Sequence, residues 1–287
     1  MPTPIRSLAD LWDFLRDVKD EILRDRVLAV SGGVTFYALL AIVPAITALI
    51  SVFGLVLDPA DVPRLLDPVT SVLPEEASTL ITDQATRISG KANDTLSLTA
   101  LVALVIALWS ANGGTKALIE ALGIAYDVKE TRGFVQLNLV ALAFTLGAIA
   151  LVIVLGALVA ALPFLVDQLG PVGESLLLAL RWPVMLALLL GVLAAIYYWA
   201  PDRPDAEWAW ITPGAVVAAI GLILASAGLG WYVTNFGSYD ETYGSLAAVV
   251  VLMLWIWLST VMVLVGAEIN AELDRRTARR RGSVPAV

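Results

Sequence analysis

The stretch Thr242–Ala267, TYGSLAAVVVLMLWIWLSTVMVLVGA, contains 26 consecutive residues without Asp, Glu, Lys or Arg. An apolar helix of about 20 residues is long enough to cross a bilayer. Five more uncharged stretches are also long enough: Val27–Leu57, Thr95–Thr115, Gly133–Val166, Trp182–Pro201 and Trp208–Tyr239. None of them reaches the roughly 40 residues that two crossings and a turn need. The sequence therefore predicts six transmembrane helices.

The composition agrees with a membrane protein. Hydrophobic residues make up 59% of the chain and charged residues 15%, whereas globular domains carry about 25% charged residues. We predict an all-α, polytopic fold in which residues 1–275 form one membrane domain and 276–287 a basic cytoplasmic tail. Arginines that follow a membrane helix are typical of contact with anionic lipid headgroups rather than with nucleic acid. The expected spans are about residues 34–57, 95–113, 136–162, 182–200, 209–234 and 243–267.

The segment before the first span has the pattern of an amphipathic helix. Its apolar residues recur at helical spacing beside acidic ones: Leu8, Leu11, Trp12, Leu15, Val18 and Ile22. Such a helix is expected to lie on the membrane surface with its apolar face among the headgroups. A coiled-coil helix or a helix that docks a partner would show the same pattern.

The orientation follows from the charges outside the spans. With six spans, both termini lie on one side, which then carries 14 Lys and Arg against 4 on the other. Because positive residues concentrate on the cytoplasmic side, we expect both termini in the cytoplasm and the protein in the inner or plasma membrane. The outer segments carry 11 acidic residues, so most of the net charge of -8 is an outer-face property.

The missing residue types exclude several chemistries. The chain has no Cys and no His, which removes disulfides, thiolate metal sites and the usual general base near neutral pH. The spans contain no acid or base other than tyrosine, which argues against a proton pump with a carboxylate at the membrane midplane. No connection between spans is large enough for a soluble catalytic domain. We therefore expect no enzyme, no cofactor and no metal.

The end of the second span contains a candidate site, WSANGGTK at 109–116. Gly113 and Gly114 favour a break in the helix, with Asn112 as a cap of the next segment. Alternatively, exposed backbone amides there could bind a phosphate or carboxylate with help from Lys116.

Charged residues flank the cytoplasmic ends of other spans. Arg132 directly precedes the third span and Glu268 directly follows the sixth, so we predict an ion pair that clamps this end of the bundle; a gate or a substrate contact is the alternative. Glu268 and Glu272 share a helix face and repel unless a cation lies between them. Asn270 lies beside them.

Four uncharged residues complete the candidates. Asn138 and Tyr243 are expected to bond across helices, as polar groups in lipid usually do. Pro44 lies inside the first span and is expected to kink it, because proline removes a backbone hydrogen bond. Together with Tyr37, such a kink is also compatible with a solute cavity.

Several of these stretches together carry a family resemblance that spans about residues 8–275. They are GGVTFYALL at 32–40 with Pro44, WSANGG at 109–114, ALGIAY at 121–126 with Glu130–Arg132, and TYGSLAA at 242–248 continuing to GAEINAE at 266–272. In these stretches the chain resembles the YihY/BrkB family of six-pass inner-membrane proteins, which implies an all-helical, six-span fold. Some members are labelled ribonuclease BN, and others virulence or serum-resistance factors.

The ribonuclease label conflicts with the residues. A nuclease metal site needs His or clustered acids, and the sequence contains neither His nor an acidic cluster outside its small loops. We predict instead a transporter or exporter of a small organic or lipid-like solute. The alternative is a structural, envelope-organising membrane protein without transport. The expected partners are membrane lipids and an unknown small solute, and no nucleic acid is expected. The sequence is also compatible with a homo-oligomer.

Overall fold

The computed structural model describes residues 7–53, 98–203, 208–209, 211–236 and 247–280. All regular structure in these residues is α-helical, which confirms the all-α prediction for them. The helices are α1 (Leu8–Arg24), α2 (Val27–Phe53), α5 (Leu98–Ala125), α6 (Phe134–Trp199), α7 (Pro213–Phe236) and α9 (Ala247–Arg280).

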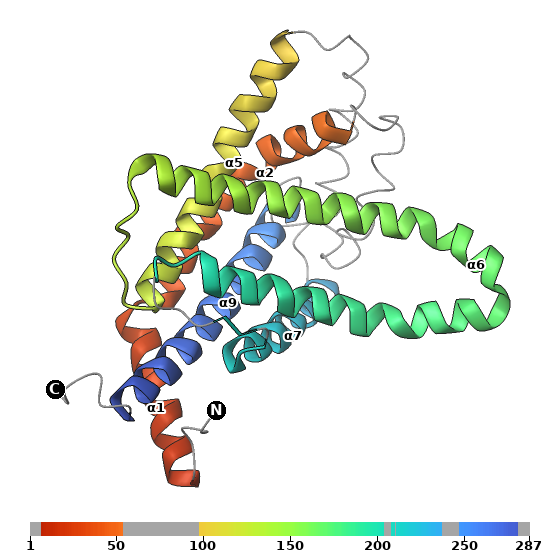
Figure 1. Cartoon of the computed structure of the whole chain (residues 1–287). Helices are drawn as coiled ribbons and strands as arrows, with labels where there is room; N and C mark the ends of the chain where they lie inside the picture. Colours follow the sequence, from red (N-terminus) through yellow and green to blue (C-terminus); the bar gives the residue numbers. More distant parts are fainter. Residues whose placement is uncertain (1–6, 54–97, 204–207, 210, 237–246, 281–287) are drawn as a thin grey trace.

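The described residues of each predicted span lie in a helix, except residue 200 of the fourth span and residues 209, 211 and 212 of the fifth. The helices α2, α5, α7 and α9 each hold the helical part of one span, whereas α6 holds those of both 136–162 and 182–200. Figure 1 shows α6 turning back at its far end, so that its two halves run in opposite directions. The span residues 54–57, 95–97, 210 and 243–246 lie outside the described part of the chain.

Three described segments are long and apolar enough to cross a membrane: Phe134–Leu151, Pro213–Asn235 and Ala247–Arg279. The helix α1 and the segment Val27–Ile42 meet at a bend of 53° and give a fourth crossing if together they form one broken span. Pro183–Trp199 is apolar but shorter. The protein is thus a helical membrane protein with several candidate spans.

The N-terminal segment forms the predicted amphipathic helix. Ser7 begins it as an N-cap, because its hydroxyl accepts a hydrogen bond from the Asp10 amide at 3.1 Å. Phe14 and Val18 are buried against the rest of the protein, whereas Leu8 and Trp12 are exposed. The exposed apolar residues leave α1 with a face suited to the headgroup region of a membrane.

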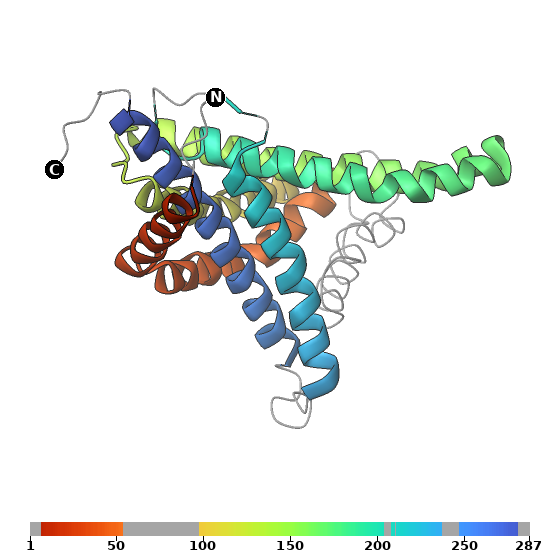
Figure 2. The same cartoon turned by 90° about the horizontal axis from the view of Figure 1, so that it is seen from below.

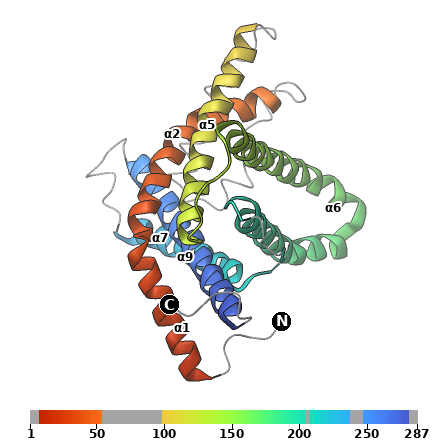
Figure 3. The ribbon, with the colours of Figure 1, turned by 60° about the vertical axis from the view of Figure 1, so that its left-hand side comes forward.

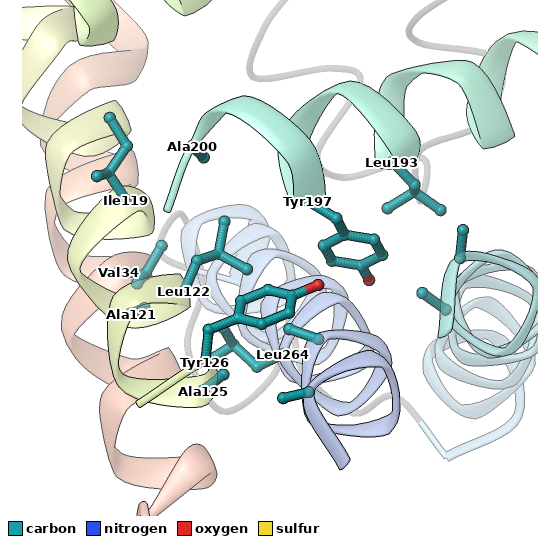
Figure 4. Close-up of a cluster of buried hydrophobic side chains, with 14 of the residues drawn as sticks. Val34, Ile119, Ala121, Leu122, Ala125, Tyr126, Leu193, Tyr197, Ala200 and Leu264 are labelled. Carbon is teal, nitrogen blue, oxygen red and sulfur yellow. The ribbon is translucent and has the colours of Figure 1, made fainter. Parts of the chain in front are cut away.

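The core lies where α2, α5, α7, α9 and the C-terminal end of α6 meet. Leu122 of α5 and Leu264 of α9 are almost completely buried there, together with Leu193 and Tyr197 of α6 (Figure 4). The helix α5 packs along α2 (Figure 3). Figure 2 shows α7 and α9 side by side.

The crossing of α7 and α9 depends on two glycines. A Cβ atom on Gly266 would lie 2.5 Å from the Gly214 carbonyl oxygen and 2.9 Å from the Ala218 Cβ. A Cβ on Gly214 would in turn collide with the Gly266 carbonyl. The two backbones can therefore approach only because both residues lack a side chain. Beside the crossing, the hydroxyl of Tyr197 links α6 to α9 by donating a hydrogen bond to the Val263 carbonyl at 2.8 Å.

The predicted helix break at Gly113 and Gly114 is wrong. The helix α5 continues from Leu98 to Ala125 through both glycines. Its internal hydrogen bonds therefore occupy the backbone amides that the anion-site alternative required. Gly114 instead allows close packing on α2, because a Cβ there would lie only 3.3 Å from the Ala38 Cα.

Pro44 lies inside α2 without ending it, since the helix runs to Phe53. Figures 1 and 3 show the C-terminal turns of α2 running in a different direction from its N-terminal part. A change of direction is the expected effect of a proline within a helix, because its ring removes one hydrogen bond and crowds the preceding turn.

Candidate functional site at the polar end

Four segments that are distant in the sequence meet at one end of the molecule, toward the lower left of Figure 1. They are α1, the loop after α5, the loop after α6 and the C-terminal part of α9. Polar contacts join them: Arg276–Asp17, Arg275–Asp127, Arg203–Asp274 and Thr131–Asp202. We call this region the polar end.

Two arginines of α9 organise the polar end. Nε of Arg276 lies 2.6 Å from Glu272 Oε1, and Nε of Arg275 lies 3.2 Å from Glu272 Oε2. Arg276 also pairs with Asp17 of α1 and lies over the Phe14 ring, with its Cζ 5.3 Å from the ring centroid. Glu272 is only 3% exposed. Its buried charge is therefore balanced by two guanidinium groups.

Asp127 joins α9 to α1. Its Oδ2 lies 3.0 Å from Arg275 Nη1 and 3.2 Å from Arg24 Nη2. The residue has φ 55°, a left-handed conformation that ends α5 and turns its carboxylate toward both arginines. Arg24 also pairs with Glu21 and Asp25.

Three carboxyl groups form the carboxylate triad of Glu21, Asp25 and Glu268. One carboxyl oxygen from each lies within 4.8 Å of the others. Glu268 is 0% exposed, and no N–H group or hydroxyl of the described residues donates to its carboxyl oxygens, which lie beside the Asp25 carboxyl group. Asp25 and Glu268 also line a small pocket whose other walls are apolar side chains of α2, α5 and α9. The triad can thus offer oxygen ligands to a cation.

The predicted ion pair between Arg132 and Glu268 is wrong. Arg132 binds Glu130 instead, with Nε 2.7 Å from Oε1 and Nη2 2.6 Å from Oε2, and it donates to the Ala200 carbonyl at 2.7 Å. These hydrogen bonds hold the pKa of the Glu130 carboxyl below its usual range. Arg132 therefore ties the start of α6 to its end, while α9 directs Glu268 toward α1.

Asn270 forms a junction between three elements. Its Oδ1 accepts from the Gly214 amide at 2.9 Å, and its Nδ2 donates to Thr212 Oγ1 at 3.0 Å and to the Tyr126 hydroxyl at 3.4 Å. Burial raises the pKa of Tyr126 to about 12, so this hydroxyl stays protonated. Arg203 stacks on the Tyr126 ring, with its Cζ 3.9 Å from the ring centroid. Asn270 therefore fixes the start of α7 against α5 and α9.

A second polar group lies between α5 and the first half of α6. Asn112 Nδ2 and Lys116 Nζ each donate to Asn138 Oδ1 at 3.1 Å. One turn further along, the hydroxyls of Thr115 and Thr145 are 3.0 Å apart. Asn112 is buried, and its Oδ1 has no partner among the described residues. We call these five residues the α5–α6 seam. The predicted bonding of Asn138 across helices is confirmed.

The remaining candidates lie apart from both groups. Tyr37 is 52% exposed and contacts the Phe36 ring edge to face. It therefore faces outward rather than into a cavity between the described helices. Tyr243 lies outside the described residues.

Sequence reasoning missed the carboxylate triad because two of its acids lie at the C-terminal end of α1, Glu21 within the helix and Asp25 as its C-cap, and the third lies in α9, more than 240 positions away. Two signals pointed to it. Glu21 and Asp25 are four residues apart, the spacing that places side chains on one helix face. Glu268 is the first charge after an apolar stretch of 26 residues, at the edge of the predicted span.

The comparisons with known proteins identify the family. The family model "Virulence factor BrkB" matches residues 18–286. The chain is 36% identical to the ribonuclease-like protein YfkH of Bacillus subtilis over 183 residues, which are 60% of this chain and 65% of YfkH. It is 30% identical to a UPF0761 membrane protein of Azoarcus over 276 residues, covering 94% of this chain and 65% of that protein.

A UPF0761 membrane protein of Vibrio parahaemolyticus is 31% identical over 280 residues, 92% of this chain and 82% of that protein. The chain thus spans about two thirds of the length of the YfkH and Azoarcus relatives. No solved structure matches it. With the family model covering most of the chain and several relatives described as membrane proteins, this chain belongs to the virulence factor BrkB family of membrane proteins.

Proposed function

We propose that this chain is a six-span protein of the cell membrane with both termini in the cytoplasm. The polar end supports this topology. The four segments that meet there are the four that an even number of spans assigns to one side, and that side carries the excess of Lys and Arg. The predicted outer turn of α6, at residues 163–181, lies at the opposite end of that helix hairpin (Figure 1).

We further propose that the protein moves a small organic or lipid-like solute across the membrane. The α5–α6 seam is the observation that carries this proposal. It places a lysine and two asparagines between helices that are otherwise apolar. Polar and ionisable groups are expensive between membrane helices, and those that persist commonly mark a solute pathway.

The seam also suggests the kind of solute. Lys116 lies half-buried with its Nζ 5.7 Å from the centre of the exposed Trp109 ring. A cation beside an aromatic ring, at the predicted cytoplasmic end of a span, suits an amphipathic solute with an acidic head and an apolar body. Anionic lipids and small organic acids are therefore the first candidates.

Reconstitution in liposomes tests this function. Vesicles with the purified protein should pass at least one member of a panel of fluorescent lipids and small organic acids faster than empty vesicles. Lys116→Met should reduce that flux at least tenfold while leaving the protein folded. Lys129→Met is the matched control, because Lys129 is exposed and lies outside the seam. Absence of flux across the panel with folded protein would contradict transport.

A structural role in organising the envelope is the second candidate. One observation favours it: the pocket at the carboxylate triad is small and apolar on most sides. Under this role, no solute passes and Lys116→Met lowers only the stability of the bundle.

We propose no enzymatic activity for the chain. The ribonuclease-like description belongs to a relative, and this chain offers no His or Cys for catalysis. Purified protein incubated with labelled RNA and Mg²⁺ should leave the RNA intact. Cleavage that co-purifies with the folded protein and stops in Glu268→Gln would overturn this part of the proposal.

A further inference from the structure

We propose that Glu21, Asp25 and Glu268 form a binding site for one divalent metal cation, which links α1 to α9 at the polar end. The site is independent of whether the protein transports a solute. It lies outside the α5–α6 seam and uses none of its residues.

The arrangement of the oxygens is the first argument. The three carboxyl groups converge from two elements, with one oxygen from each within 4.8 Å of the others. Metal–oxygen distances of about 2.0–2.6 Å place the ligand atoms of one ion roughly 3–5 Å apart. The triad therefore has the spacing of ligands around a single cation.

The second argument is the unpartnered state of Glu268. Its side chain is fully buried, and among the described residues no N–H group and no hydroxyl donates to either of its carboxyl oxygens; its polar neighbour is the Asp25 carboxyl group. Oδ2 of Asp25 is likewise buried without such a donor in the described part of the chain. A buried carboxylate is costly unless a donor or a positive charge compensates it. These oxygens are therefore free to bind a cation from solution.

The balance of charge points in the same direction. Arg24 pairs with Glu21 and Asp25, Arg275 approaches Glu21, and both arginines are shared with Asp127. Arg275 also pairs with Glu272. Within the described residues, no ion pair includes Glu268. The arginines thus offset the charge of Glu21 and Asp25 but do not reach Glu268, the most deeply buried acid of the triad.

The ligand chemistry selects the class of metal. The site offers carboxylate oxygens, and the chain has no His or Cys. Hard cations such as Mg²⁺, Ca²⁺ and Mn²⁺ prefer oxygen ligands, whereas Zn²⁺ and Cu²⁺ favour nitrogen and sulfur. A divalent ion of the first group would offset two of the three acidic charges and join the N-terminal helix to the last one.

Mn²⁺ is the probe for a direct test. The full-length protein, purified in detergent and stripped with a chelator, is titrated with Mn²⁺ while the free ion is followed by electron paramagnetic resonance. We expect one bound Mn²⁺ per chain, with affinity reduced at least tenfold by Glu268→Gln or Asp25→Asn. The matched control is Glu120→Gln, an acid-to-amide change at an exposed position of α5 outside the triad, which should leave Mn²⁺ binding within threefold of wild type.

Thermal unfolding separates a metal from a proton as the occupant. Mn²⁺ should raise the Tm of wild type, because a ligand that binds only the folded state stabilises it. In chelator, Glu268→Gln should unfold at or above the wild-type Tm, since it removes one of three neighbouring acids, and Mn²⁺ should no longer raise it. If Glu268→Gln fails to fold, Asp25→Asn serves for the same comparison.

Two binding results would overturn the site. One is the absence of stoichiometric Mn²⁺ binding by folded wild type at millimolar concentrations. The other is equal Mn²⁺ binding by wild type and both triad variants. A higher Tm of Glu268→Gln without any effect of Mn²⁺ on wild type would assign the compensating charge to a proton and likewise contradict the proposal.

Discussion

The two parts of α9 are held in the protein by different forces. From Ala247 to Ala267 the helix is uncharged and packs on α7, with Gly266 against Gly214. From Glu268 to Arg280 it carries three acids followed by four arginines, and Arg275 and Arg276 pair with Asp127 and α1. The first part is held by close backbone packing at glycines, and the second part is held by ion pairs between side chains.

The difference between the two parts follows the environment of the helix, with close backbone packing in the apolar part and ion pairs in the charged part. Close packing of backbones stabilises helices in lipid, where burying apolar surface brings little gain. Ion pairs serve where the helix leaves the bilayer and meets other loops. The change from one regime to the other falls between Gly266 and Glu268, the predicted edge of the last span. We infer that this edge is the cytoplasmic interface of the membrane.

The largest expected effect breaks the apolar part. Gly266→Ala should lower the free energy of unfolding by about 3 kcal/mol, because the added methyl meets backbone and Tyr197 atoms that cannot move aside. Gly113→Ala is the control, since a Cβ there meets nothing within 4 Å. Ala is also the better helix former by about 1 kcal/mol, so this control should be neutral or stabilising. Unfolding in detergent measures the stability of both variants. Equal changes in the free energy of unfolding for Gly266→Ala and Gly113→Ala would contradict the close crossing of α7 and α9.

The next effect breaks the charged part. Arg276→Met should lower the free energy of unfolding by about 2 kcal/mol. The change leaves Glu272 paired with Arg275 alone and removes the ion pair between Arg276 and Asp17. A fully buried pair costs roughly 3–5 kcal/mol to break, but the Arg276 side chain is 17% exposed. Arg279→Met is the matched control, because Arg279 is exposed. The loss should be smaller when Glu272 is already Gln, and strict additivity of the two changes would argue against the pair.

The smallest expected effect concerns two carboxyl groups in the loops of the polar end, Glu130 and Asp202. Hydrogen bonds from Arg132 lower the pKa of Glu130, and those from Thr131 lower the pKa of Asp202. A carboxyl whose pKa is lower in the folded state adds stability above its unfolded pKa and loses it as the pH falls through the folded value. Stability should therefore decline slightly below about pH 4.5, the ordinary pKa of Glu.

This pH effect is measured by unfolding between pH 7 and pH 3. Glu130→Gln and Thr131→Val should each flatten the acidic decline, whereas Lys129→Met should not change its shape. Because both carboxyl groups are partly exposed to solvent, screening by salt should reduce the effect further. An acidic decline of the same shape in every variant would assign it to other acids.

The sequence predicts the helices well and their contacts poorly. Runs without charge place the helices, because a membrane excludes unpaired charges and unsatisfied backbone groups alike. Asn138 was correctly expected to bond across helices, since a polar amide between apolar helices has few other partners. These predictions depend on local composition, which a single chain displays.

Contacts between distant segments could not be derived in the same way. The carboxylate triad unites the C-terminal end of α1, including its C-cap Asp25, with α9, and the partner of Arg132 is Glu130 rather than Glu268. Both depend on how helices are rotated about their axes, which uncharged runs do not specify. The glycine pair of α5 was misread as a break, because Gly allows both a turn and a close helix contact, and only the position of α2 decides between them.

Cysteine accessibility tests the central claim, that the polar end is one cytoplasmic surface, most directly. The chain has no native Cys, so single variants Lys19→Cys, Lys129→Cys, Arg279→Cys and Gln168→Cys report one position each. A membrane-impermeant maleimide added to intact cells should label only the variant at 168, and permeabilised cells should show labelling of the other three. Labelling of position 19, 129 or 279 from outside intact cells would contradict the six-span account.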